Sequence, residues 1–87
     1  PWNSVAVAAG IGRIALLGTD IRPDTPEKVL ALRRELSGDP ATAALLRALQ
    51  AAADWCADPD SHEELASLLG AADVLDLDQA LVRRSLD

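Results

Sequence analysis

The chain has 87 residues, enough for one small domain that buries about 60% of the surface exposed by its unfolded state. Its hydrophobic fraction of 49% is mostly Ala and Leu, with Trp2 and Trp55 as the large aromatic residues, a composition typical of closely packed helices. A net charge of −6 argues against a nucleic-acid partner, and the apolar runs are too short to predict a membrane span.

The first 17 residues predict a short helix followed by a strand. Asn3 or Ser4 can cap a helix that runs through Ala9, and Gly10 can adopt the left-handed conformation that ends it. Residues 13–17, Arg-Ile-Ala-Leu-Leu, form an apolar run bounded by glycines. Such a run is typical of a short buried strand.

The next segment, residues 18–26, contains two prolines and is predicted to be a loop. From 26 to 36 the local signals conflict. Thr25 before Pro26 resembles the start of a helix, whereas Val29 and its apolar neighbours also suit a buried strand. The residues alone leave both alternatives open.

An amphipathic helix is predicted after Asp39 and Pro40, which suit the N-cap and the first helical position. Its polar face carries Arg47, Gln50 and Asp54. The opposite, apolar stripe consists of Leu45, Leu46, Leu49, Ala52, Ala53 and Cys56.

Two further helices follow the turn at residues 58–60. Ser61 and Glu64 predict a capping box, and Gly70 a helix end, for a helix whose inner face is Leu65, Leu68 and Leu69. Asp78 is predicted to cap a last helix with Arg83 and Arg84 near its C-terminal end and with Leu81, Val82 and Leu86 as apolar positions.

The residues that could carry chemistry do not form a catalytic or metal-binding pattern. Cys56 and His62 are the single Cys and the single His, so they cannot complete a zinc site, and one Cys fixes no redox compartment. Cys56 lies on the apolar stripe and is predicted to be a small buried residue. Acidic residues near position 60 lack the glycine of a calcium loop and fit helix capping better. No catalytic residue, metal or cofactor is predicted.

Lys28 is the single lysine and stands at the end of the proline-marked loop. Its ammonium is a compact charge with three donors, which suits a small anion better than the planar fork of arginine does. The alternative is an ordinary solvated lysine paired with Glu27 or Asp24.

Five short motifs occur in order along nearly the whole chain: Pro1-Trp2-Asn3, Gly10-Ile11-Gly12-Arg13, Pro26-Glu27-Lys28-Val29-Leu30, Trp55-Cys56-Ala57-Asp58-Pro59 and Leu81-Val82-Arg83-Arg84-Ser85-Leu86. Together they resemble the solute-binding proteins of nitrate, nitrite and bicarbonate ABC importers, a family that includes cytoplasmic nitrate sensors. In that family a Gly-Glu precedes Pro-Trp-Asn. We therefore expect a fragment of a longer protein, without its first lobe.

The resemblance implies part of an α/β periplasmic-binding-protein type II fold that is mostly helical, with one or two short strands and about four to five helices. Residues 1–32 would supply a hinge or second-lobe helix and strands, and residues 33–87 the C-terminal helical part. The resemblance also favours a strand over residues 28–32 and a short helix over residues 33–36.

For the site, the resemblance implies that Lys28 contacts the anion, with support from Glu27 and Trp2. In bicarbonate-binding relatives the position of Glu27 helps to hold a metal ion. No metal or cofactor is assigned to this chain.

The implied function is binding without chemistry: a small oxyanion, expected to be nitrate, would be held for ABC import or for sensing. The partner would be an ABC permease at the extracytoplasmic face of the membrane, or a regulator if the parent is a cytoplasmic sensor. The alternative is a non-enzymatic helical interaction module without a small-molecule ligand. Surface of the fragment that would contact the missing lobe is expected to be exposed and to favour self-association.

Overall fold

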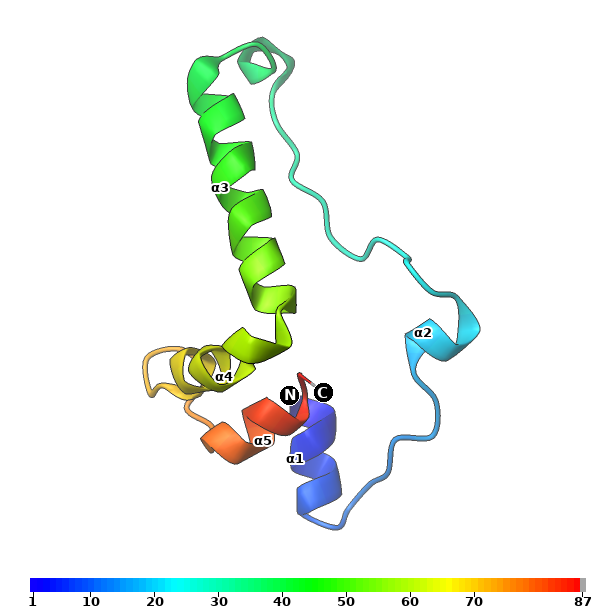
Figure 1. The fold of residues 1–87 in the computed structure, drawn as a ribbon. Coiled ribbons are helices and arrows are strands. Elements are labelled where there is room, and N and C mark those ends of the chain that lie inside the picture. Colours follow the sequence, from blue (N-terminus) through cyan, green and yellow to red (C-terminus); the bar gives the residue numbers. More distant parts are fainter. Residues whose placement is uncertain (87) are drawn as a thin grey trace. The chain divides into compact units, whose positions relative to one another are not determined.

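A computed structural model describes residues 1–86 as five α-helices and two 3-10 helices (Figure 1). The bounds are α1 Trp2–Ala8, α2 Gly18–Ile21, η1 Arg34–Leu36, α3 Pro40–Ala57, η2 Pro59–Ser61, α4 His62–Gly70 and α5 Gln79–Arg84. The prediction of four to five helices is confirmed. The chain divides into two compact units, one made of residues 1–16 with residues from 56 onward, the other of residues 17–55.

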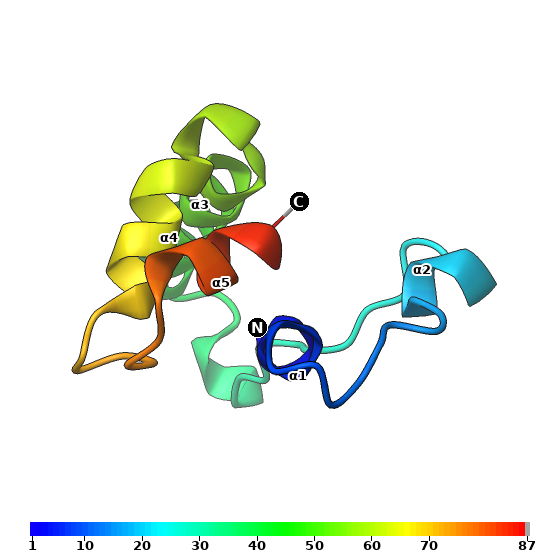
Figure 2. The same ribbon diagram turned by 90° about the horizontal axis from the view of Figure 1, so that it is seen from below.

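The first unit is built on α1, α4 and α5, which lie together in both views (Figures 1 and 2). Its core consists of Leu65 and Ala66 from α4 and Val82 from α5; Val82 is only 1% exposed. Ser4 is buried inside α1 and accepts a hydrogen bond of 2.9 Å from the Ser85 hydroxyl. This bond joins α1 to the end of α5. The prediction that Ser4 or Asn3 caps α1 is wrong, because the helix begins at Trp2 without a side-chain cap.

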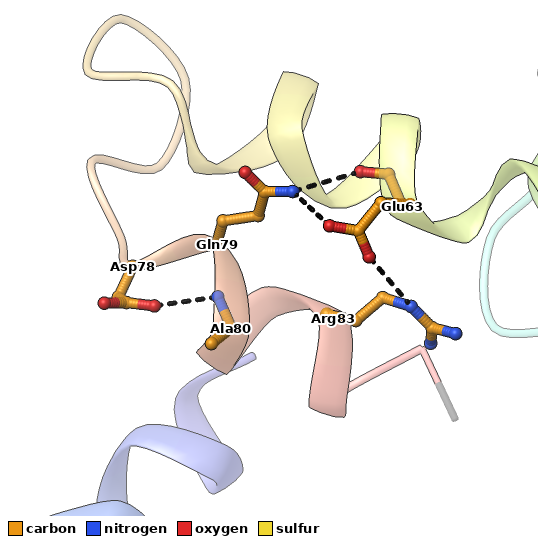
Figure 3. Close-up of polar contacts among 5 residues, drawn as sticks. All are labelled: Glu63, Asp78, Gln79, Ala80 and Arg83. Carbon is orange, nitrogen blue, oxygen red and sulfur yellow. Dashed lines mark hydrogen bonds and ion pairs between the residues drawn. The ribbon is translucent and has the colours of Figure 1, made fainter.

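Polar side chains join α4 and α5 at the surface (Figure 3). Gln79 Nε2 donates to Glu63 Oε1 at 2.7 Å and to the Glu63 carbonyl oxygen at 3.4 Å. Arg83 Nε lies 3.7 Å from Glu63 Oε2, in an ion pair that is too exposed to contribute much stability. Asp78 caps α5 as predicted, because its Oδ1 accepts from the Ala80 amide at 2.7 Å.

The turn between α4 and α5 approaches the end of α4 closely. The Leu77 amide donates to the Gly70 carbonyl oxygen at 3.2 Å. A Cβ atom added at Gly70 would lie 2.9 Å from the Leu77 carbonyl oxygen, closer than real Cβ atoms approach a backbone oxygen. Gly70 is therefore required by this contact, in addition to ending the helix as predicted.

The second unit contains α2, η1 and most of α3. Asp39 caps α3 as predicted: its Oδ1 accepts from the Ala41 amide at 2.8 Å. The predicted apolar stripe is present on α3 but is not buried, since Leu45, Leu46 and Leu49 are 46%, 47% and 46% exposed. Cys56 at the end of the stripe is also exposed, so its prediction as a buried residue is wrong.

The strands predicted over residues 13–17 and 28–32 are absent from residues 1–86, where both segments run as irregular chain (Figure 1). A strand is stable only when its backbone groups pair with a neighbouring strand. No backbone hydrogen bond within the described residues begins or ends at residues 13–16 or 28–32. The apolar pattern is therefore present without the ladder that would make it a sheet.

Four other predictions differ locally. The loop expected over residues 18–26 contains the single turn of α2, and the helix expected over residues 33–36 is the 3-10 turn η1. Ser61 makes no capping bond, because it lies in a helical conformation at the end of η2; Asp58 instead caps that turn by accepting from the Asp60 amide at 3.0 Å. Leu68, expected on the inner face of α4, is 55% exposed.

Candidate functional site

The loop that leads to Lys28 is held by its own hydrogen bonds. The Leu17 amide donates to Asp20 Oδ2 at 2.8 Å, which starts the turn of α2, and the Arg22 amide donates to the Gly18 carbonyl oxygen at 2.9 Å. The Thr25 hydroxyl then donates to the Arg22 carbonyl oxygen at 3.2 Å. These short-range bonds fold the loop back on itself before the chain reaches residue 28.

The folded loop lines a hollow of about 470 Å³ that is open to solvent and lies within the second unit. Most of its wall is apolar or uncharged, and two ionisable side chains of opposite charge, Arg22 and Glu27, complete it. The lining residues are Leu17, Gly18, Thr19, Ile21, Arg22, Thr25 and Glu27. An anion entering this hollow would meet the Arg22 guanidinium, which attracts it, and the Glu27 carboxylate, which repels it.

Lys28 directly follows Glu27, the last residue of the hollow's wall, and is exposed. Lys28 is not itself one of the lining residues. Its ammonium makes no hydrogen bond or ion pair with any other part of residues 1–86, so the pairing with Glu27 or Asp24 that was the alternative to anion binding is not formed. Trp2 lies at the start of α1 in the other unit and is 63% exposed. Its supporting role therefore stays a prediction, as does anion contact by Lys28.

Residues 1–70, which include this loop and Lys28, match the NMT1-like family. The chain belongs to the NMT1-like family. This family of solute-binding proteins is the one that the sequence motifs resemble, so the predicted resemblance is confirmed.

Among curated relatives, the nitrate import ATP-binding protein NrtC of Synechocystis sp. (strain PCC 6803) is 39% identical over 71 residues, covering 79% of this chain and 11% of that protein. The nitrate/nitrite binding proteins NrtA of Synechococcus elongatus and of Nostoc sp. (strain PCC 7120) are 36% and 30% identical, over 78% and 87% of this chain. The chain spans only 16% and 20% of those two proteins. No solved structure gives a significant match.

Sequence reasoning singled out Lys28 in this NMT1-like chain but missed Arg22 and the apolar wall of the hollow. Arg22 stands immediately before Pro23, in a segment predicted only as a loop. The sequence offered one indication that Arg22 could take part in the site: it is a cation that lies six residues before Lys28. Nothing in the spacing indicated that Leu17 and Ile21 would form the same wall, because that depends on the turn of α2.

The remaining reactive side chains do not assemble into a second site. Within residues 1–86, no cluster of three or more His, Cys, Asp and Glu side chains is placed to hold a metal ion. His62 Nδ1 is buried and has no hydrogen-bond partner in that part of the chain. A second hollow, of about 570 Å³, lies beside the Glu63–Arg83 ion pair and contains both acidic and basic side chains.

A helix must be both long and largely apolar to cross a bilayer. No helix of residues 1–86 meets both requirements.

Proposed function

We propose that this NMT1-like chain contributes the anion-contacting lysine of a receptor that binds a small oxyanion, nitrate in the first instance, for ABC-type import. One observation carries the proposal. Lys28, the single lysine, is exposed and unpaired within the described residues, and it directly follows a residue that lines a hollow. The names of the NrtA relatives, nitrate/nitrite binding proteins, support nitrate or nitrite as the ligand.

The physical basis is replacement of hydration. A small anion leaves water only where charged or neutral donors take the place of its hydration shell. Lys28, which follows the wall residue Glu27 in the chain, offers three ammonium donors, and Arg22 offers a cation on the wall itself. The chain as a whole disfavours anions, because its net charge is −6. A local cluster of positive charge is therefore what anion binding requires here.

The wider setting is proposed from the family and from the names of the relatives. The receptor would deliver its ligand to an ABC permease at the extracytoplasmic face of the membrane; in a cytoplasmic sensor a regulator would take the permease's place. Binding would involve no covalent chemistry. If bicarbonate were the ligand, the carboxylate of Glu27 would help to hold an accompanying metal ion. Trp2 keeps only the supporting role that the resemblance implies.

A chimera tests the assignment of Lys28. The 70 aligned residues of the Synechococcus elongatus NrtA are replaced by the matching residues of this chain, and nitrate is titrated into the product by calorimetry. The chimera is expected to bind nitrate, and Lys28→Ala is expected to weaken binding at least tenfold, about 1.4 kcal/mol. Arg34→Ala is the matched control, because Arg34 is an exposed cation in η1 that, unlike Lys28, is not adjacent in sequence to a residue lining the hollow.

Circular dichroism of each variant separates loss of binding from loss of folding. A folded Lys28→Ala chimera with the nitrate affinity of the unmodified chimera would refute the role of Lys28. An equal loss of nitrate affinity in Lys28→Ala and Arg34→Ala would show that any cation of the chain contributes as much as Lys28 does. The assignment of the anion site to Lys28 would then be wrong.

A different function, that of a helical interaction module, is favoured by a different observation. The apolar stripe of α3 is about half exposed, although the sequence pattern is that of a helix face that packs against another surface. This reading needs no ligand at Lys28. It is distinguished from the receptor by the nitrate titration, in which an interaction module would bind no nitrate.

A further inference from the structure

Among the described residues that line the hollow of the second unit, Glu27 is the one acidic side chain. Its charge is not cancelled by a contact, because within residues 1–86 neither the Glu27 carboxylate nor the Arg22 guanidinium has an ion pair or a hydrogen bond. Asp20 and Asp24 belong to the same loop but do not line the hollow. Glu27 therefore places an unpaired negative charge on the wall that an anion would meet.

We propose that Glu27 is a specificity-determining residue of the anion site, which keeps divalent oxyanions such as sulfate out while a monovalent oxyanion binds. The inference rests on the proposed function, because it takes Lys28 as the anion contact. Arg22 and Lys28 then bring two positive charges to the site and Glu27 one negative charge, so the site has a net charge of +1. A monovalent anion neutralises that charge, whereas a divalent anion leaves an excess negative charge beside the carboxylate.

The charge of the ligand determines how strongly Glu27 discriminates. The electrostatic energy between the carboxylate and an anion is proportional to the charge of the anion. The factor by which Glu27 weakens the binding of a monovalent anion is therefore squared for a divalent anion at the same distance. Glu27 is exposed, and exposed charges change the affinity of a partner by about threefold. The expected penalties are about threefold for nitrate and about tenfold for sulfate.

The uncharged part of the wall offers little that could offset this repulsion. Leu17 and Ile21 carry no side-chain donor, and the Thr25 hydroxyl already donates to the Arg22 carbonyl oxygen at 3.2 Å. A divalent anion is more strongly hydrated than a monovalent one, so it needs more donors to replace the water that it loses. Repulsion by Glu27 and the shortage of donors therefore act in the same direction.

Competition titrations on the NrtA chimera test this role. Nitrate affinity is measured by calorimetry with and without about 50 mM potassium sulfate, with a chelator present and the ionic strength held at about 0.15 M by potassium gluconate. Glu27→Gln removes the charge and keeps the shape of the side chain. We expect it to tighten nitrate binding about threefold and sulfate binding about tenfold, so that the preference for nitrate over sulfate falls about threefold.

Two further variants are the controls. Glu35→Gln makes the same chemical change in η1, at a residue that does not line the hollow, and is expected to leave the preference unchanged. Glu27→Asp keeps the negative charge and is expected to keep the preference. Circular dichroism verifies that each variant is folded.

The outcomes separate this inference from the role of Lys28. An unchanged preference in Glu27→Gln, or sulfate that still fails to compete with nitrate, would show that another feature excludes divalent anions. Weaker nitrate binding in Glu27→Gln would show that Glu27 supports the anion instead of selecting it. Each of these results overturns the inference while a loss of affinity in Lys28→Ala still supports the proposed function. A chimera that binds no nitrate, or binds it equally well after Lys28→Ala, overturns both.

Discussion

Truncating Val82 measures how much of the first unit's stability depends on its small core. Val82→Ala removes two carbon atoms from a side chain that is 1% exposed, which costs about 1.6 kcal/mol of transfer free energy at about 0.8 kcal/mol for each carbon. The unfilled space adds about 1 kcal/mol, and the better helix propensity of Ala returns about 0.5 kcal/mol. We expect a net loss of about 2 kcal/mol.

Thermal and urea unfolding followed by circular dichroism give this quantity, and the loss corresponds to a Tm lower by about 8–16 °C in a domain of this size. Val74→Ala is the matched control: it is the same chemical change in the same unit, at a side chain that is 56% exposed. That variant is expected to lose about 0.5 kcal/mol or less. Equal losses in the two variants would refute the assignment of α1, α4 and α5 to one core centred on Val82.

Two further substitutions address backbone features of the two units. Asp39→Ala removes the side-chain cap of α3 and is expected to cost about 1 kcal/mol, seen as roughly fivefold faster hydrogen exchange of the amides in the first turn; unchanged exchange would contradict the cap. Gly70→Ala forces a Cβ against the Leu77 carbonyl oxygen and is expected to cost about 1–2 kcal/mol in urea unfolding after the gain in helix propensity. Gly38→Ala, where an added Cβ meets no atom within 4 Å, is its control and should be neutral or stabilising.

Helix ends and turns were the part of the fold that the sequence predicted well, because their causes lie within a few residues. The carboxylates of Asp39 and Asp78 accept from amides two residues ahead, and Gly10 adopts the left-handed conformation expected of a helix stop, with φ of 70°. Even here a competing local structure changed the outcome at Ser61. The 3-10 turn η2 placed it in a helical conformation that a capping residue does not adopt.

Burial and sheet formation were predicted poorly because both depend on distant partners. Leu49 and Cys56 share a stripe with the pattern of a buried helix face, yet the pattern does not specify which surface covers it. Residues 28–32 show the same effect in the backbone, since they have strand-forming residues but no neighbouring strand in the described part of the chain. The wall around the candidate site was missed for a related reason, because Arg22 joins it only through the folding of its loop.

The proposed site at Lys28 has a defined dependence on ionic strength. Attraction of a small anion to Lys28 and Arg22 weakens as salt screens the two cations, and chloride also competes for them. We therefore expect the nitrate affinity of the chimera to fall as sodium chloride is added. Nitrate affinity that rises with sodium chloride would contradict an electrostatic site at Lys28.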